Sequence, residues 1–205
     1  MDKYAFSFVI DISGTPYSNI TLGLCTFEMK RYSDIIKEFG QQFPEFRRSR
    51  NKGCTLKHNR LQDILTFLNS RGVHMSVLHF SGMDWHYYKQ KYSNKAFFKE
   101  KIMACLYFML ISKNTRIDHK TLITVDNDSW MDIHKAFSEC KSLALANHYD
   151  FDISIGYSTQ DDRIRLADFI ASSYTKIPRK WLDQIENYKV IPSEIPGMLL
   201  SKVFR

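Results

Sequence analysis

The chain has 205 residues, of which 44% are hydrophobic and 25% are charged, so it holds enough apolar side chains for a globular core. Lys and Arg outnumber Asp and Glu by 29 to 22, and the resulting net charge of +7 suits polyanion binding without requiring it. The four cysteines, Cys25, Cys54, Cys105 and Cys140, include no C-x-x-C pair, which argues against a zinc ribbon or a disulfide scaffold and favours a reduced, cytoplasmic setting.

The first part of the chain predicts a β-hairpin followed by two helices. Residues 4–12 and about 19–29 are rich in β-forming residues, and the turn residues 13–16 make the link between them short. We therefore expect two antiparallel neighbouring strands. Apolar residues at helical spacing then predict a short helix at 31–43 and a clear one at 59–70.

Helices and strands alternate from there to residue 176. Residues 95–112 are apolar on more than one face, which predicts a buried helix, and their apolar run is too short to span a bilayer. We expect no membrane partner. The remaining predicted elements are strands at 73–80, 121–126 and 151–156 and helices at 130–147 and 161–176.

This order of elements predicts an α/β fold, with a mixed sheet flanked by helices rather than a helix bundle or a sandwich. We expect one domain over residues 1–177, with a helical insertion. Residues 178–205 form an extended C-terminal tail that is too apolar to be disordered. The tail is predicted to pack on the domain or on a partner.

Two aspartates occupy the ends of apolar strands. Asp11 follows Phe8, Val9 and Ile10, and Asp126 ends the run 121–126. Functional groups in open α/β sheets collect at the carboxyl ends of strands, so the two carboxylates could meet. Such a pair repels unless a divalent cation neutralises it, and hard oxygen ligands suit Mg²⁺ or Mn²⁺. The alternative is that each Asp only opens the turn after its strand.

A third aspartate lies within the apolar helix at 161–176. Asp168 stands seven residues after Asp161, with Arg165 between them, so all three border one edge of the apolar stripe. A carboxylate at the rim of a buried face either pairs with a cation or serves as a ligand. The alternative is an ion pair of Arg165 with Asp161 or Asp168 on a solvated edge.

These motifs resemble a family of uncharacterised RNase H-like proteins that open with Ile-Asp-Glu-Ser-Gly and close with a Ser-containing loop before a Gln-x-Ala-Asp helix. The opening here is Ile10-Asp11-Ile12-Ser13-Gly14, and the closing segment runs over 158–171 and contains Arg165-Leu166-Ala167-Asp168. Val125-Asp126 occupies the place of the family's central-strand Asp. The resemblance covers roughly residues 4–176.

The resemblance implies an RNase H-like fold and a nuclease site in which Asp11, Asp126 and Asp168 hold two Mg²⁺ or Mn²⁺ ions. Two acids of the family's pattern are absent, because Ile12 stands in place of the motif Glu and Thr55 in place of the Glu of a Glu-x-Lys. Asp161 is our candidate for a further metal ligand, and the sequence leaves Asp128 and Glu28 open as substitutes.

A basic segment precedes and enters the helix at 59–70. Its side chains could contact nucleic-acid phosphates, although a solvated loop is the alternative. The segment 84–92 interleaves aromatic residues with Lys, as a stacking platform for single-stranded bases would, but Trp85 and Tyr88 could equally cover the buried helix. The candidate phosphate contacts are Arg47, Arg48, Arg50, Lys52, Lys57 and Arg60.

The leading hypothesis is therefore a divalent-metal-dependent nuclease that acts on DNA or RNA, single strands included. The alternatives are a catalytically degenerate RNase H-like module that binds nucleic acid, and a protein-interaction domain whose aspartates are ordinary caps and ion pairs. The sequence leaves open whether the chain forms a homo-oligomer.

Overall fold

The computed structural model describes residues 4–15, 17–47, 52–115, 121–127, 131–157 and 161–205. Within them a six-stranded mixed sheet has the order β5-β4-β1-β2-β3-β6. β1, β2 and β3 are antiparallel neighbours, β4 runs parallel to β1, β5 runs parallel to β4, and β6 runs parallel to β3. The strands are β1 (Phe6–Gly14), β2 (Ile20–Glu28), β3 (His74–Phe80), β4 (Thr121–Asp126), β5 (Phe151–Gly156) and β6 (Tyr188–Ile191).

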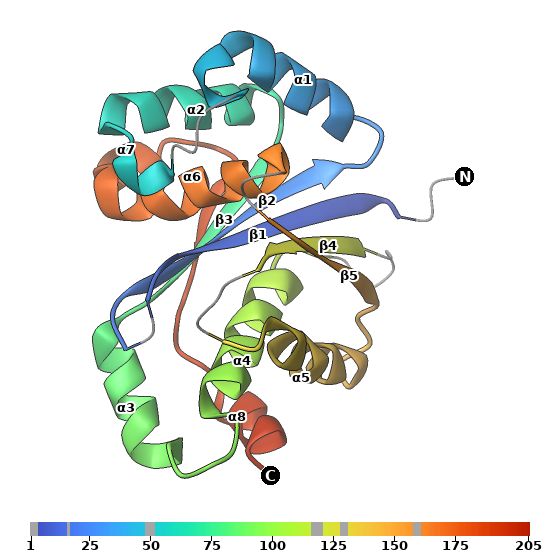
Figure 1. Ribbon diagram of the computed structural model, residues 1–205, viewed down its shortest axis with the longest axis vertical. Helices are drawn as coiled ribbons and strands as arrows, with labels where there is room; N and C mark the ends of the chain where they lie inside the picture. Colours follow the sequence, from blue (N-terminus) through green and yellow to red (C-terminus); the bar gives the residue numbers. More distant parts are fainter. Residues whose placement is uncertain (1–3, 16, 48–51, 116–120, 128–130, 158–160) are drawn as a thin grey trace.

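Helices cover both faces of this sheet (Figure 1). On one face, α6 lies against the central strands, and α1, α2 and α7 lie beyond it; α4, α5 and α8 cover the other face. The helices are α1 (Tyr32–Gln42), α2 (His58–Ser70), α3 (Gly82–Tyr92), α4 (Phe98–Ser112), α5 (Ile133–Leu145), α6 (Asp162–Lys176), α7 (Arg179–Leu182) and α8 (Gly197–Val203), with short 3₁₀ turns at Pro44–Arg47 and Gly53–Thr55.

The alternation of side chains along β1 assigns residues to the two cores. Phe8 and Ile10 pack with α4, whereas Val9 packs with α6. Successive side chains of a strand point to opposite faces, so this pattern also fixes which way the later residues of β1 point. Helix α4 is buried on nearly all sides, which is why its sequence shows no polar face.

Helix α6 approaches the sheet closely because β2 has a glycine beneath it. A Cβ atom at Gly23 would lie 2.3 Å from the carbonyl oxygen of Ala167 and 2.5 Å from the backbone nitrogen of Ala171. Any larger residue would push the helix away from the sheet. The position of α6 matters for the candidate site because this helix carries Asp168.

The mixed sheet with flanking helices, predicted from the sequence, is confirmed. The predicted strands at 121–126 and 151–156 coincide with β4 and β5, and the first two strands form the expected antiparallel pair. Helix α3 and strand β6 were not predicted. Helix α3 begins with a capping box in which the Ser81 hydroxyl accepts from the Asp84 N–H and the Asp84 carboxylate from the Ser81 N–H.

The last part of the chain contributes to both the sheet and the core. β6 pairs with β3 at one edge of the sheet, and α8 contacts α4 and α5. Leu199, Leu200 and Val203 of α8 are buried there. None of the described helices is long and apolar enough to cross a membrane.

Candidate active site

The register of the two central parallel strands places Asp11 next to Asp126. Ile10 of β1 pairs with Val125 of β4, so the next residue of each strand is an aspartate. Ile10 and Val125 both pack with α4. The following side chains therefore point to the opposite face, towards α6.

Asp11 is buried in this position, with only 7% of its surface exposed. Its Oδ1 accepts a hydrogen bond of 2.8 Å from the backbone N–H of Ile12. Burial raises the pKa of the Cys25 thiol of β2 far above its usual range, and the charges of Asp161 and, least, Asp11 raise it further. Asp11 and Asp161 thus both lie close to Cys25, beneath α6. The Cys25 thiol stays protonated.

Asp168 lies on α6, opposite the sheet face that carries Asp11 and Asp126. It lies in the middle of α6 and is 7% exposed. Its Oδ2 accepts a 2.6 Å hydrogen bond from the backbone N–H of Gly53, and its Oδ1 accepts from the Ser172 hydroxyl at 3.4 Å. Gly53 is required for this contact, because a Cβ atom there would lie 2.6 Å from Ser172 Oγ.

The electrostatics of Asp168 show what surrounds it. Burial raises the pKa of this carboxyl, and the hydrogen bond from Gly53 and the nearby Lys52 lower it in part. The charge of Asp126 raises it further, although this is the smallest of the five effects. Asp126 therefore lies within electrostatic reach of Asp168, across the gap between β4 and α6.

Asp161 is engaged by a neighbouring arginine. It caps the N-terminus of α6 by accepting from the Arg163 N–H at 2.9 Å, and the Arg163 guanidinium donates to both of its carboxylate oxygens. The alternative interpretation, an ion pair of Arg165 with Asp161 or Asp168, does not hold: Arg165 pairs with Asp162 at 3.2 Å and donates to the Phe46 carbonyl. Asp161 and Arg163 form a compact pair over one short turn, which leaves Arg165 to tie α6 to the turn at Pro44–Arg47.

The donor set fits a hard divalent cation in its chemistry, since it consists of carboxylates whose remaining lone pairs can coordinate a metal. A hydrogen-bonded carboxylate such as Asp168 is the usual state of a metal ligand. In the part of the chain that the structure describes, however, no three His, Cys, Asp or Glu side chains already converge as a metal centre. Cation binding would therefore require these side chains to turn towards one another.

Of the other acids considered, Glu28 does not join this group. Glu28 of β2 lies opposite Phe6 of β1 in the antiparallel register. Phe6 stands five residues before Asp11, so about 17 Å along the strand separates Glu28 from the position of Asp11. Asp128 lies outside the described residues. Ile12 packs against the core on the α4 side, so an acid at this position would point away from the three aspartates. Thr55 is an exposed residue of the turn Gly53–Thr55.

Two of the three aspartates are thus brought to one face by β1 and β4, and α6 brings the third above them. Sequence reasoning missed the contribution of Gly53 and Ser172, which orient Asp168. A glycine at the end of a basic loop was the available signal for Gly53, since glycine often marks a close approach of the backbone.

Solved structures with the same fold were found by comparison. The ribonuclease H2 from Pyrococcus horikoshii OT3 matches with a TM-score of 0.56 and 12% identity, over 87% of this chain and 76% of that one. RNase HII from Archaeoglobus fulgidus, solved in a complex with PCNA, matches with a TM-score of 0.53 and 14% identity, over 85% and 76%. A mutant of Bst-RNase HIII matches with a TM-score of 0.52 and 13% identity, over 89% of this chain and 54% of its own.

The fold is RNase H-like. At 12–14% identity the likeness concerns the fold alone. No protein-family model matches the chain, and no curated protein is significantly similar to it in sequence. The three aspartates remain candidates that rest on the geometry of this chain.

The candidate phosphate contacts of the basic segment are only partly described. Arg48 and Arg50 lie outside the described residues, and of Arg47 only the backbone is described, at the end of a 3₁₀ turn. Lys52 and Lys57 are exposed. Arg60 is engaged by Glu45 and Asp63, and its guanidinium carbon lies 4.6 Å from the centroid of the Phe43 ring.

The aromatic segment 84–92 forms most of α3 rather than an open platform. Trp85 is fully buried against Phe80, and Tyr88 is 6% exposed. These two rings therefore cover the core, as the alternative interpretation held, and are not free to stack on bases. Tyr87 is exposed.

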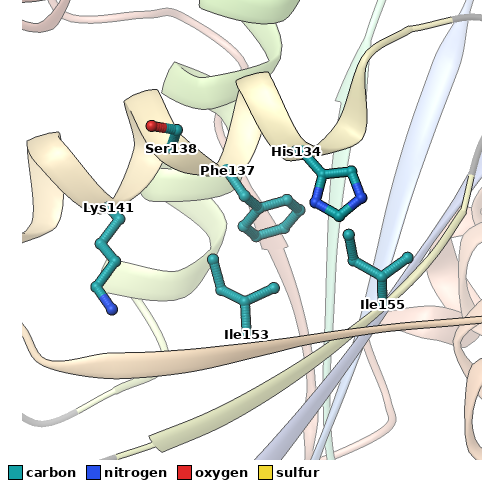
Figure 2. Close-up of a pocket in the computed structure, with 6 residues that line it drawn as sticks. All are labelled: His134, Phe137, Ser138, Lys141, Ile153 and Ile155. Carbon is teal, nitrogen blue, oxygen red and sulfur yellow. The ribbon is translucent and has the colours of Figure 1, made fainter.

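A pocket of about 260 Å³ lies between α5 and the edge strand β5 (Figure 2). Phe137 of α5 points towards Ile153 and Ile155 of β5, and the side chains of His134 and Lys141 flank them. These isoleucines pack on the α4 side of the sheet. The pocket is therefore separated from the aspartates by the sheet.

Proposed function

We propose that this protein is a divalent-metal-dependent nuclease that hydrolyses phosphodiesters of DNA or RNA at Asp11, Asp126 and Asp168. The observation that carries the proposal is that three carboxylates share one face of the sheet: Asp11 and Asp126 lie side by side on the adjacent parallel strands β1 and β4, and Asp168 faces them from α6. We also assign the chain to the uncharacterised RNase H-like family that its opening and closing motifs resemble. The structural likeness to ribonucleases H2, HII and HIII supports both proposals through the fold.

Each residue has a distinct task in this proposal. Asp11 would contribute to both metal sites, and Asp126 and Asp168 would each complete one of them. Gly53 and Ser172 hold the carboxylate of Asp168 in one orientation. Two Mg²⁺ or Mn²⁺ ions would supply an activated water and positive charge for the leaving oxygen.

Lys52 is a basic residue close to Asp168. Its charge acts on Asp168, and its side chain is exposed. The negative charge of the three aspartates repels an approaching phosphate, and a nearby ammonium group offsets part of this repulsion. We propose that Lys52 and Lys57 contact the nucleic-acid backbone beside the cleavage position.

The test is cleavage of duplex DNA, RNA and single strands with Mg²⁺ and with Mn²⁺. We expect metal-dependent cleavage that falls at least about 100-fold in Asp11→Asn, because a carboxylate that would hold the metal ions loses its charge. The exposed acid Asp34 of α1 provides a control, since Asp34→Asn removes the same charge away from the site. A wild-type protein that cleaves none of these substrates with either metal would refute the proposal.

A second candidate is a degenerate RNase H-like module that binds nucleic acid without cleaving it. The observation in its favour is that the described acids do not already form a metal centre, and that Asp161 is held by Arg163. This candidate predicts salt-sensitive binding that survives Asp11→Asn and weakens in a Lys52→Ala, Lys57→Ala double variant. A protein-interaction domain would show neither metal binding nor nucleic-acid retention.

A further inference from the structure

Strand β5 forms one edge of the sheet, and it lacks the features that usually protect an edge from further pairing. Within the described residues, β5 pairs with β4 alone. The opposite edge is protected, because β6 has only four residues, carries the exposed Lys189 and is followed by Pro192. β5 has six residues and contains neither Lys nor Pro. Its outer edge is therefore a template on which another strand can pair.

The backbone groups on this outer edge belong to Ile153 and Ile155. At the start of the ladder with β4, the Thr121 N–H donates to the carbonyl oxygen of Asp150, and at its end the carbonyl oxygen of Gly156 accepts in the same way. Successive residues of a strand direct their backbone groups to alternate sides. The even-numbered residues of β5 therefore bind β4, and the N–H and C=O groups of the two isoleucines point outwards.

The side chains of the same two isoleucines line a groove between β5 and α5 (Figure 2). They pack on the core but are only partly buried. The groove has a volume of about 260 Å³, which is below the usual range of small-molecule sites, about 300–1,000 Å³, and suits single side chains. A strand added to β5 would direct alternate side chains into it. This β5 groove is lined by His134, Phe137, Ser138, Lys141, Ile153 and Ile155.

The ionisable side chains that line the β5 groove are basic. Lys141 is a cation, His134 becomes one on protonation, and the described lining contains no acid. The two stand seven residues apart on α5, about 10 Å along the helix, at the two ends of the groove. Glu139 of the same helix lies towards α4, where its charge acts on Cys105. Asp152 of β5 points to the opposite face of the sheet. The groove therefore favours a ligand that carries carboxylates.

We propose that this edge binds an extended acidic segment of another protein, which pairs with β5 and places an apolar side chain, flanked by carboxylates, in the β5 groove. Backbone hydrogen bonds to Ile153 and Ile155 supply affinity, and the groove supplies specificity for alternate side chains. The apolar side chain contacts Phe137. Acidic residues two positions before and after it stand about 13 Å apart along a strand, within reach of His134 and Lys141.

Other occupants fit these features less well. If β5 paired with β5 of a second copy of this chain in one continuous sheet, the two α5 helices would lie side by side. Lys141 and His134 of each copy would then face the same basic groups, which repel. A nucleic acid would attract the basic groups, but it has no strand backbone to pair with the edge. The groove lies on the α4 side of the sheet, so binding there does not depend on the proposed nuclease site.

The test is a two-dimensional ¹H–¹⁵N NMR titration of the full chain with the acetylated and amidated peptide Thr-Glu-Thr-Val-Thr-Glu-Thr, up to millimolar concentration. We expect saturable shifts at the amides of β5 and α5. In the complex, hydrogen exchange should slow at the amides of Ile153 and Ile155, which point outwards. It should change little at Ser154, whose amide faces β4. This alternation separates strand pairing from binding in the groove alone.

Lys141→Glu reverses a partly exposed charge at the groove and leaves the backbone edge intact. It should weaken peptide binding about three- to tenfold. Lys37→Glu is the matched control, because Lys37 is exposed on α1, which lies on the other side of the sheet (Figure 1). This variant should bind the peptide as the wild type does. A peptide with Lys in place of both Glu residues should give no saturable shifts.

Five results would each overturn the proposal. The acidic peptide gives no saturable shifts, or the Lys-containing peptide binds equally well. The amides of Ile153 and Ile155 exchange as fast in the complex as in the free protein, or Lys141→Glu binds the peptide with unchanged affinity. The β5 amides shift with protein concentration alone, or with a single-stranded oligonucleotide in place of the peptide, which would assign the edge to a second copy or to nucleic acid.

Discussion

At the scale of single residues, Asp168 shows a conflict between stability and the proposed function. Burial raises its pKa, so the native structure disfavours the charged form that metal binding needs. Two hydrogen bonds, from Gly53 and Ser172, offset part of that cost. Such a carboxylate weakens the fold at neutral pH and is retained where function requires it.

We therefore expect Asp168→Asn to stabilise the protein and to abolish metal-dependent cleavage. An asparagine keeps an oxygen that can accept from Gly53, and it removes the buried charge. The effect should be about 1 kcal/mol, which for a chain of this size raises the Tm by about 2–4 °C. Thermal unfolding at pH 7 by circular dichroism measures it. A Tm below that of the wild type would show that the charged form supports the fold.

His79 provides a pH-dependent contribution to stability. Its ring stacks on Tyr174 with centroids 4.9 Å apart, and Nδ1 lies 2.9 Å from the Thr21 hydroxyl oxygen. Burial lowers the pKa of His79, and Asp84 offsets this only in part. An unfolded histidine titrates near pH 6.5. Between the lowered native pKa and about pH 6.5, the unfolded chain therefore binds more protons than the native one.

The contribution of His79 to the free energy of unfolding should accordingly be complete above about pH 6.5. It should be lost as the pH falls towards the native pKa of His79. In His79→Gln this part of the pH dependence should disappear, and urea unfolding between pH 5 and pH 8 measures it. His58→Gln is the control, because His58 is exposed at the start of α2. If the free energy of unfolding changed with pH to the same extent in His79→Gln and in the wild type, His79 would not be the source of this pH dependence.

At the scale of elements, close packing of α6 on β2 fixes the distance between the helix that carries Asp168 and the strands that carry Asp11 and Asp126. Gly23→Ala would place a methyl group 2.3 Å from the Ala167 carbonyl oxygen, which is backbone and cannot move alone. We expect a loss of about 1–3 kcal/mol in the free energy of unfolding, measured in urea. Cleavage activity should fall with it, since α6 shifts away from the sheet.

Gly197→Ala is the matched control for this substitution. A Cβ atom at Gly197 would meet no atom within 4 Å, at the first residue of α8. This change should leave the free energy of unfolding unchanged or raise it slightly, because alanine has less freedom in the unfolded chain. A Gly23→Ala variant as stable as Gly197→Ala would show that α6 adapts to a larger residue without cost.

The elements themselves were largely predictable where periodicity is strong. The strands that end on Asp126 and Gly156 and the helix at 58–70 follow directly from their apolar patterns. Helix α3 was not predictable in this way, because its aromatic and basic residues alternate without a clear apolar face. The short β6 was hidden for another reason: its pairing with β3 is long-range, and four residues carry too little local signal.

The site was predictable as a set of acids and not as a set of contacts. The sequence placed Asp11 and Asp126 at the ends of two apolar strands; Asp126 does end β4, whereas β1 continues to Gly14, and the register places the two aspartates side by side. The partners of Asp161 and Asp168 depend on tertiary approach. Arg163, Gly53 and Ser172 occupy those roles, and only the last stands at a helical spacing from Asp168 that sequence could have suggested.

At the scale of the whole molecule, the sheet is completed from both ends of the chain. β1 lies at its centre, and β6, from the last twenty residues, covers the outer edge of β3. Helix α8 then packs against α4 and α5 on one face. The last part of the chain is therefore integral to the hydrophobic core, although it follows the segment that resembles the RNase H-like family.

We expect a chain truncated after Pro178 to lose its cooperative fold. The truncation exposes the edge of β3 and uncovers apolar surface of α4, and it removes Ile191, Leu200 and Phe204 from the core. Apolar burial of this kind stabilises by about 25 cal/mol per Å², and native proteins have only about 5–15 kcal/mol to lose. Urea unfolding of residues 1–178 should show no cooperative transition, and a hydrophobic dye should bind at pH 7.

Removal of Arg205 alone, which is exposed at the end of the chain, should leave the transition unchanged. A truncated chain that unfolds cooperatively, with dispersed amide signals, would instead make residues 1–178 an autonomous domain and the remainder a dispensable covering.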